Sequence, residues 1–249
     1  MRLDLYLVKM GFVRSRERAK ELIQEGKCLI NGKPILKSAY NFDEEGDRLE
    51  FLEHDFVFVG RAALKLEAAL DEFSLDVKGK VIVDVGVATG GFSDSLLRRG
   101  ARKVFGVDVG KGQLKAEIAE NPKFVFVNKD VRLLESQDFP DGVDMVVVDV
   151  SFISLRMVFP SLVRLFGYQK EIDYIFLIKP QFELGKKHSG VIKDPKELQR
   201  VLRELEDYFQ GNGAQIIQTM ASPIRGKEGN QEYLWYLHYD PDNKTVGNH

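Results

Sequence analysis

The 249-residue chain contains only one cysteine, Cys28, and this scarcity excludes several kinds of site. A single thiol can form no intramolecular disulfide and no cysteine metal cluster, and the four histidines lack the spacing typical of metal ligands. We therefore expect neither a disulfide nor a bound metal.

Long apolar runs are also missing. No segment approaches the roughly 18 to 20 apolar residues that cross a bilayer, and the N-terminus lacks the apolar stretch and cleavage site of a signal peptide. The sequence therefore predicts a cytoplasmic protein that does not contact a membrane. Its 44% hydrophobic content is enough for one substantial core and a small second domain, which is typical of a globular protein.

The net charge of −2 conceals an uneven distribution. Residues 1–42 carry nine Lys or Arg against four Asp or Glu, a balance of +5, so the rest of the chain carries −7. A basic small module beside an acidic larger one indicates that the first part contacts a polyanion.

Within residues 1–47 the sequence predicts two helices followed by a β-hairpin. Apolar residues at helical spacing precede Gly11, and a second helix is expected from Ser15, a residue type that caps helix N-termini, to Gly26. Asn31-Gly32 between two short apolar runs is the strongest short-range hairpin signal in the chain. Basic side chains cluster at the start of the second helix, where backbone N–H groups also attract phosphate. The predicted RNA-binding residues are Arg2, Arg14, Arg16, Arg18 and Lys20.

This order of elements resembles the S4 RNA-binding domain over the whole module. The resemblance is carried by Arg2-Leu3-Asp4, Ser15-Arg16-Glu17-Arg18-Ala19 and Leu29-Ile30-Asn31-Gly32-Lys33. It implies that the module anchors the protein on folded RNA through backbone shape, without choosing the target nucleotide. The alternative is a small helical cap whose arginines form a solvated face.

After a linker expected at 48–59, residues 60–240 alternate buried strands with helical segments. This alternation predicts an α/β fold, a parallel sheet with helices on both faces. Strands are expected at 81–86, 104–108, 124–127, 145–150 and 174–178, and two more, at 214–220 and 233–238, would close the sheet with a terminal hairpin. The polar tail at 241–249 is expected to be disordered.

A glycine-rich turn follows the first of these strands, at residues 84–92. Glycines let the backbone approach a ligand, and the helix expected to begin near Phe92 offers its N-terminus to a negative group. Asp108 ends the second strand, 22 residues after Gly86, where an acid can hold ribose hydroxyls. Asp130 ends the third strand and is a candidate for binding an adenine amino group.

An acid after each of three consecutive strands fits S-adenosylmethionine better than NAD. The turn departs from the dinucleotide pattern Gly-x-Gly-x-x-Gly, and no lysine follows Gly91 to suggest ATP or GTP. Taken singly, each acid has an alternative explanation as a strand-end cap. The predicted S-adenosylmethionine-binding residues are Asp84, Gly86, Thr89, Gly90, Gly91, Phe92, Asp108 and Asp130.

Two lysines and two carboxylates, far apart in the chain, are expected to share one cleft: Lys65, Asp149, Lys179 and Glu232. Methyl transfer from a sulfonium requires the acceptor oxygen to lie in line with the methyl group, so positioning supplies much of the rate. A hydroxyl is a poor nucleophile until its proton leaves, and a neutral lysine can remove that proton. We predict Lys179 as the base, with Lys65, Asp149 and Glu232 orienting the reacting groups.

The chain as a whole resembles the hemolysin A (TlyA) family. The matching segments are Leu64–Leu70, Asp84–Gly86, Thr89–Phe92, Val107–Gly110, Asp149–Leu155, Ile178–Glu183, Ser222–Ile224 and Gly229–Glu232. The resemblance implies an FtsJ-like, Rossmann-like methyltransferase domain after a small α+β S4 domain, and a Lys-Asp-Lys-Glu tetrad at the four residues above. It also implies a bacterial enzyme that methylates a cytidine 2'-hydroxyl in ribosomal RNA, with ribosomal RNA or ribosomal subunits as partners. The chain departs from the family's usual residues at Ala62-Ala63 and at Ala88.

Two other functions are compatible with parts of the sequence. One is an S4-anchored RNA-binding or ribosome-assembly factor with weak or no transferase activity, which the complete tetrad argues against. The other, suggested by the family's name, is a membrane-damaging hemolysin, which the lack of a transmembrane stretch and of an amphipathic lytic helix argues against. The sequence does not indicate the oligomeric state.

Overall fold

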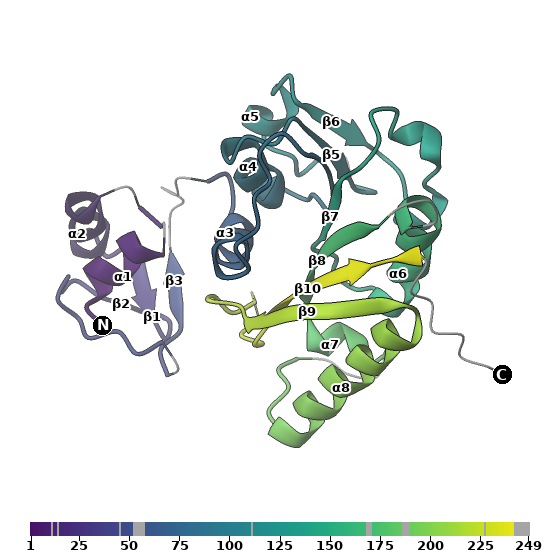
Figure 1. The fold of residues 1–249 in the computed structure, drawn as a ribbon. Coiled ribbons are helices and arrows are strands. Elements are labelled where there is room, and N and C mark those ends of the chain that lie inside the picture. The colour runs from purple at the N-terminus through teal and green to yellow at the C-terminus, as the bar shows by residue number, and fades with distance from the viewer. Residues whose placement is uncertain are drawn as a thin grey trace.

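The structure is a computed structural model that describes residues 1–10, 12–13, 15–44, 46–51, 58–110, 112–167, 171–185, 190–226 and 228–241. A small N-terminal part and a larger α/β part lie side by side (Figure 1). Arg14 and all of the predicted disordered tail except Pro241 lie outside the described residues.

The small part contains the two helices and the hairpin that the sequence predicts. Its elements are α1 (Leu3–Lys9), α2 (Arg16–Gln24), β1 (Cys28–Ile30), β2 (Lys33–Pro34) and β3 (Leu49–Phe51). The Ser15 hydroxyl accepts a hydrogen bond from the Arg18 N–H at 3.2 Å and so caps α2. Asn31 and Gly32 both have positive φ, at 54° and 76°, as a two-residue hairpin turn of this kind requires.

β3 corrects the expectation of a linker over the whole of 48–59. Its residues Leu49–Phe51 pair with β1 in antiparallel register, which gives a three-stranded sheet of order β2-β1-β3. Three residues are too few to show the alternation that identifies a strand, so the pairing was not visible in the sequence.

The larger part is built on a seven-stranded sheet of order β6-β5-β4-β7-β8-β10-β9. Its strands are β4 (Val81–Val85), β5 (Lys103–Val107), β6 (Phe124–Val127), β7 (Met145–Val148), β8 (Ile172–Ile178), β9 (Ala214–Ala221) and β10 (Tyr233–Tyr239). The first five are parallel, and β10 is antiparallel to both β8 and β9. The predicted parallel sheet closed by a terminal hairpin is therefore confirmed, with the last strand inserted between β8 and β9.

Helices cover both faces of this sheet (Figure 1). They are α3 (Ala62–Glu72), α4 (Gly91–Arg98), α5 (Ala116–Ala119), α6 (Leu155–Leu162), α7 (Pro180–Glu183) and α8 (Pro195–Gly211), with short turns η1 (Val131–Leu133), η2 (Ser136–Asp138) and η3 (Val163–Gly167). The strands alternate between two cores: Val83 packs on the side of α6 and α8, while Ile82 packs on the side of α3 and α4. Strands buried on both faces explain the continuous apolar runs in the sequence.

The core of the small part continues into the larger one. Leu64 of α3 and Ile224, from the loop between β9 and β10, are buried with the apolar residues of α1, α2 and β1. The Tyr6 hydroxyl also donates to the Pro223 carbonyl at 3.4 Å. The carboxyl edge of the parallel strands, where α/β folds bind ligands, therefore faces the small part.

Within the described ranges, no helix is long and apolar enough to span a membrane. The same residues contain no group of three or more His, Cys, Asp or Glu side chains placed to hold a metal ion.

Candidate active site

The four residues of the predicted tetrad lie at one edge of the sheet. Asp149 follows the carboxyl end of β7, and Lys179 follows that of β8. Glu232 immediately precedes β10, whose first residue, Tyr233, pairs with Ile178 in antiparallel register. The next position of this ladder places the Glu232 backbone beside that of Lys179. Lys65 joins them from α3.

These side chains form two ion pairs. Lys65 donates to the Glu232 carboxylate, and both are buried, at 8% and 3% exposed. The Lys179 Nζ lies 2.5 Å from Asp149 Oδ1 and donates to the Ser151 hydroxyl at 2.8 Å. Each lysine therefore has its own carboxylate, a pairing that the sequence does not reveal.

The segment after Asp149 contains two further features that the sequence analysis did not single out. Ser151 accepts a hydrogen bond from Lys179. Phe152 is 87% exposed and has a φ of 65°, a conformation that is rare for a bulky residue. Its ring contacts that of Phe182, with centroids 5.0 Å apart. In the sequence they were included only as part of the matching segment Asp149–Leu155, without a role of their own.

The glycine-rich turn follows β4 and leads into α4. Gly86, Ala88 and Gly90 all have positive φ, at 86°, 45° and 95°, so the turn is a tightly wound loop. A side chain at Gly86 would collide with the Asp149 carbonyl. One at Gly91 would come within 3.1 Å of Ala62. The turn therefore packs closely against both Asp149 and the start of α3, and Ala62 lies in the second of these contacts.

Asp108 ties this turn to the loop after β5. Its carboxylate accepts from the N–H groups of Ala88 and Gly110, each at 2.9 Å. Asp130 caps η1, and its carboxylate is held by both the backbone and the guanidinium of Arg132, whose hydrogen bonds lower its pKa to about 2. The structure thus brings the three predicted acids to the same edge, with Asp130 already engaged by a charged neighbour.

Asp84 is fully buried beneath the turn. Its Oδ2 accepts from the Ser93 hydroxyl at 2.6 Å, while its Oδ1 has no hydrogen-bond partner within the described part of the chain. Burial raises the pKa of Asp84 to about 7, and the charges of Asp149 and Asp108 act in the same direction. An orphaned buried carboxylate oxygen next to a wound glycine turn fits a ligand that carries a cation or a hydrogen-bond donor. The remaining members of the predicted set, Thr89 and Phe92, lie in the turn and in the first turn of α4.

In the small part, two of the predicted RNA-binding arginines converge on one carboxylate. Asp4 is fully buried, and it accepts from Arg2 and Arg16, in each case at 2.9 Å. These hydrogen bonds, led by that of Arg2, lower the pKa of Asp4 to about 2. Arg18 pairs with Glu21 at 2.9 Å, and Lys20 lies on the same helix. Asp4 is therefore an orienting residue that charge counting alone does not identify.

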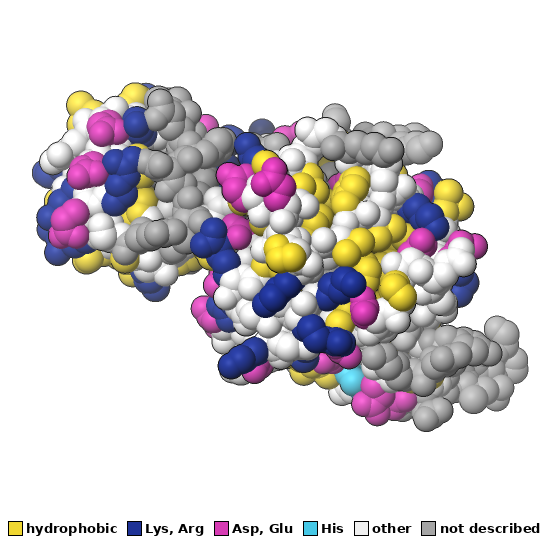
Figure 2. All heavy atoms as spheres, turned by 90° about the horizontal axis from the view of Figure 1, so that it is seen from above, with side chains coloured by type: hydrophobic (Ala, Val, Ile, Leu, Met, Phe, Trp, Pro, Cys, Tyr) yellow, Lys and Arg dark blue, Asp and Glu magenta, His cyan; other side chains and the backbone are white. Residues whose placement is uncertain are grey.

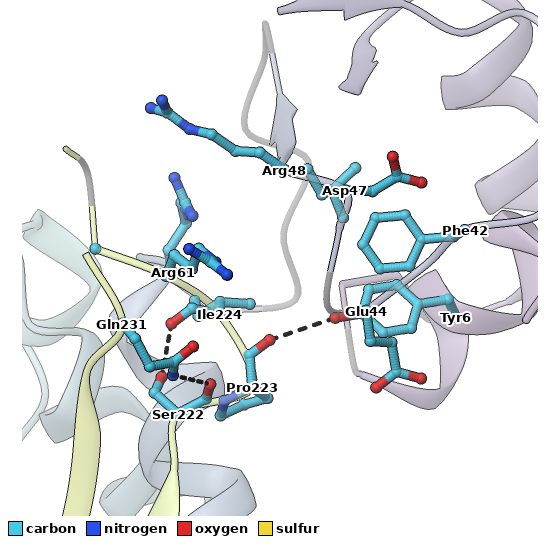
Figure 3. A pocket seen from close by; sticks show the side chains of 13 residues that line it. Tyr6, Phe42, Glu44, Asp47, Arg48, Arg61, Ser222, Pro223, Ile224 and Gln231 are labelled. Carbon is cyan, nitrogen blue, oxygen red and sulfur yellow. Dashed lines mark hydrogen bonds between the residues drawn. The ribbon is translucent and has the colours of Figure 1, made fainter. Parts of the chain in front are cut away.

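A cleft lies between the two parts (Figure 3). Tyr6 and Phe42 line it from the small part, with ring centroids 4.3 Å apart, and Arg48 reaches toward the side on which Arg61 lies. Burial lowers the pKa of Arg61, while the charge of Glu232 acts against this. Gln231, the residue before Glu232 in the chain, also lines the cleft.

Figure 2 shows the molecule from above the view of Figure 1. Hydrophobic side chains gather in a band across the larger part, with Lys and Arg beside it, while Lys, Arg, Asp and Glu are mixed on the small part. Exposed apolar residues follow three of the parallel strands: Val109 after β5, Leu133 after β6 and Phe152 after β7. The strand ends therefore offer apolar as well as charged contacts.

Comparison with known proteins agrees with this geometry. Residues 58–239 match the family described as FtsJ-like methyltransferase, and residues 1–49 match the S4 domain. The 16S/23S rRNA (cytidine-2'-O)-methyltransferase TlyA of Mycobacterium tuberculosis is 37% identical over 245 residues, which cover 97% of this chain and 91% of that protein. Hemolysin A of Brachyspira hyodysenteriae is 33% identical over 240 residues, which cover 94% of this chain and 98% of that protein.

A solved structure described as a hemolysin from Streptococcus thermophilus has the same architecture. Its TM-score is 0.73 at 31% identity, and the match covers 98% of this chain and 92% of that one. The similarity thus extends over both the small part and the sheet. The chain belongs to the FtsJ-like methyltransferase family and carries an S4 domain at its N-terminal end.

Proposed function

We propose that this protein transfers a methyl group from S-adenosylmethionine to a ribose 2'-hydroxyl of ribosomal RNA, with cytidine as the acceptor. The observation that carries the proposal is the pair of lysine–carboxylate contacts beside the glycine-rich turn at one sheet edge. The nucleotide and the type of RNA are suggested by the name of the Mycobacterium tuberculosis relative, a 16S/23S rRNA (cytidine-2'-O)-methyltransferase.

The residues of the turn fit this cofactor. Asp84 offers a buried carboxylate oxygen without a hydrogen-bond partner in the described part of the chain, which suits a cationic ligand. Asp108 lies at the end of β5, where an acid binds ribose hydroxyls, and its existing bonds to Ala88 and Gly110 hold its carboxylate in place. When bound, S-adenosylmethionine supplies an electrophilic methyl group on a sulfonium.

The tetrad supplies the acceptor chemistry. In its neutral form Lys179 accepts the proton of the ribose hydroxyl, and the contacts of Nζ with Asp149 and Ser151 fix where that nitrogen lies. The buried Lys65–Glu232 pair orients the acceptor from the other side of the edge. Because the reaction is an in-line displacement, this positioning contributes much of the rate.

The S4 domain supplies RNA affinity in this proposal. Arg2 and Arg16 are held together by Asp4, so their guanidinium groups are oriented before RNA arrives. Contacts of this kind read the phosphate backbone and set the register of the RNA, while selection of the target nucleotide falls to the catalytic edge.

The test is transfer of labelled methyl from S-adenosylmethionine to ribosomal subunits from a strain that lacks the activity. We expect label on a cytidine 2'-oxygen, identified by mass spectrometry of the digested nucleosides. Lys179→Ala should lower the rate by roughly 10²- to 10⁴-fold, the usual contribution of a general base. Cofactor affinity, measured by calorimetry, should change little.

Lys103→Ala is a matched control. Lys103 forms an ion pair with Asp141 at 2.5 Å, the same separation as Lys179–Asp149, but it begins β5 at the opposite edge of the sheet. The control should keep full activity. Full activity of Lys179→Ala would show that another group removes the proton. If the unaltered protein binds ribosomal RNA but methylates neither subunits nor free RNA, the protein is an RNA-binding factor instead.

A further inference from the structure

The loops that follow β7 and β8 are joined at more than one point. At the start of the two loops, Lys179 Nζ lies 2.5 Å from Asp149 Oδ1 and donates to the Ser151 hydroxyl at 2.8 Å. Further along, the Phe152 and Phe182 rings are in contact. At the far end of the two loops, Glu183, a residue outside the tetrad, joins the loop after β8 to the loop after β7 through hydrogen bonds.

Both carboxylate oxygens of Glu183 accept a hydrogen bond from the loop after β7. Oε2 accepts from the Ser154 hydroxyl at 2.6 Å, and Oε1 accepts from the Leu155 N–H at 2.8 Å. The side chain is only 8% exposed, and burial raises its pKa. A carboxylate that is removed from water is tolerated where its oxygens are satisfied by hydrogen bonds, and those of Glu183 are.

An ordinary helix cap does not account for this carboxylate. Ser154 already caps α6 locally, because its hydroxyl accepts from the Arg156 N–H at 3.2 Å. Ser15 on α2 and Asp194 on α8 likewise cap their helices by accepting from a backbone N–H two or three residues further along the chain. What Glu183 adds is a link between two different strand ends, across 28 residues of chain.

The segment between the two attachments is strained. Phe152 has a φ of 65° and is 87% exposed, so its backbone conformation is not stabilised by burial of its own side chain. Such a conformation persists only where the surrounding structure enforces it. The attachments on either side are Ser151, which is bound by Lys179, and Ser154, which is bound by Glu183. Releasing one of them would let the segment relax and would move Ser151 relative to Lys179.

We propose that Glu183 is a positioning residue for the proposed methyl transfer: its carboxylate fixes Ser151–Leu155 against α7 and thereby holds Ser151 and Phe152 in place beside Lys179. The hydrogen bonds of Glu183 are to Ser154 and Leu155, and neither of these residues belongs to the glycine-rich turn or to the tetrad. Its influence on the reaction is therefore exerted through the backbone of this segment.

The test compares Glu183→Ala and Glu183→Gln with the unaltered protein. Glu183→Ala should lower kcat on the order of 10- to 100-fold, because small displacements of positioned groups have effects of this size. KM for the RNA and affinity for S-adenosylmethionine should change by less than about threefold. Glu183→Gln should recover most of the rate, because its amide can accept from Leu155 N–H and donate to the Ser154 hydroxyl.

The matched control is Asp144→Ala. Asp144 also links neighbouring strands, since its carboxylate accepts from the Val81 N–H at 2.9 Å, but it does so at the opposite edge of the sheet. We expect this change to lower the melting temperature and leave kcat unaltered. Equal losses of kcat in Asp144→Ala and Glu183→Ala would overturn the proposal, since a general loss of stability would then explain both.

A second measurement does not depend on catalysis. Hydrogen exchange followed by mass spectrometry should show faster exchange in peptides covering 149–155 of Glu183→Ala, on the order of tenfold, and unchanged exchange in those covering 86–92. If the unaltered protein methylates no RNA, the proposed function fails, while the exchange result still decides whether Glu183 fixes the segment. Unchanged exchange at 149–155 would overturn the positioning role even in an active enzyme.

If Glu183→Ala does not fold, Ser154→Ala replaces it as the test variant. It removes one of the two hydrogen bonds of Glu183 and leaves the buried carboxylate bound to Leu155. We expect a smaller fall in kcat, roughly 3- to 10-fold, together with faster exchange of the same segment. Unchanged kcat and exchange in Ser154→Ala would also contradict the proposal.

Discussion

At the scale of single residues, Asp84 is a carboxyl group that is fully removed from water. It is fully buried, one oxygen accepts from Ser93, and Asp149 and Asp108 add negative charge nearby. With a pKa of about 7, its carboxyl changes protonation within the physiological range. A cationic ligand favours the ionised form, so we expect affinity for S-adenosylmethionine to increase as the pH rises through about 7.

The same group makes stability depend on pH. Between about pH 4 and 7 the folded protein binds the Asp84 proton and the unfolded chain does not, so the free energy of unfolding should fall as the pH rises through this range. The loss due to Asp84 should be at most about 4 kcal/mol. Asp84→Asn has no carboxyl proton to release at this position. Its free energy of unfolding, measured with urea, should therefore differ less between pH 5 and pH 8 than that of the unaltered protein.

Asp76→Asn is the control for this measurement, since Asp76 only accepts from the Lys78 N–H on the surface. It should leave the pH dependence unchanged. If Asp84→Asn and the unaltered protein lose stability equally between the two pH values, another group is responsible for the titration.

The sequence identified which residue types meet, but not how they pair. Lys65, Asp149, Lys179 and Glu232 were predicted to share a cleft because strand ends meet at one edge of a parallel sheet. The partners Lys65–Glu232 and Lys179–Asp149 follow from the register of β10 on β8 and from the position of α3, which are tertiary features. Asp4 and Glu183 were not assigned roles for the same reason: each binds residues of another element.

At the scale of elements, α1 and α2 are joined by a charged contact as well as by their core. Asp4 of α1 accepts from Arg2, just before α1, and from Arg16 at the start of α2. Because the pKa of Asp4 lies below its value in an unfolded chain, its stabilising contribution is present above about pH 4 and is lost as the pH falls toward 2.

Asp4→Asn should therefore weaken both the small domain and its hold on RNA. We expect a loss of about 1–3 kcal/mol in the free energy of unfolding at pH 7, because hydrogen bonds to a buried charged group are removed. RNA affinity should fall roughly 3- to 10-fold at constant salt, since Arg2 and Arg16 are no longer held in one orientation. Chemical unfolding and filter binding measure the two effects.

Glu21→Gln is the comparison for Asp4→Asn. It removes the partner of Arg18 from an exposed ion pair, of a kind that contributes little to stability. We expect a change within about 0.5 kcal/mol. An equal loss in the two variants would show that burial of Asp4 does not matter.

Prediction of the elements succeeded where apolar patterns were long. The five parallel strands and the last two were visible as apolar runs, and α2 as a capped amphipathic segment. β3 was missed because its three residues carry no periodic signal, and it is identified only by its pairing with β1.

At the scale of the whole molecule, the two domains share a core next to the residues of the predicted tetrad. Leu64, next to Lys65, and Ile224, in the loop that leads to Glu232, are both buried with the S4 residues. Docking of the small domain therefore affects the positions of both segments that carry Lys65 and Glu232. No pattern in the sequence indicates this contact, because each of the two residues fits equally well in the core of its own domain.

Ile224→Ser should loosen the docking. Burying a hydroxyl in place of the apolar side chain disfavours the contact, so X-ray scattering in solution should give a larger radius of gyration, and methyl transfer should fall about 10-fold or more. Ile217→Ser, at a position of β9 that is 42% exposed, should change neither quantity. An unchanged radius with unchanged activity in Ile224→Ser would show that the shared core does not hold the domains together.

The position of β10 has a consequence for the order in which the chain is synthesised. Glu232 and β10 come after all the other described strands in chain order, yet β10 lies inside the sheet and its first residue pairs with β8 beside Lys179. A nascent chain therefore exposes its S4 domain to RNA well before Lys65 can acquire its carboxylate partner. A chain released early by a premature stop codon would keep the S4 domain and lack Glu232, and we expect it to compete with the 249-residue chain for RNA.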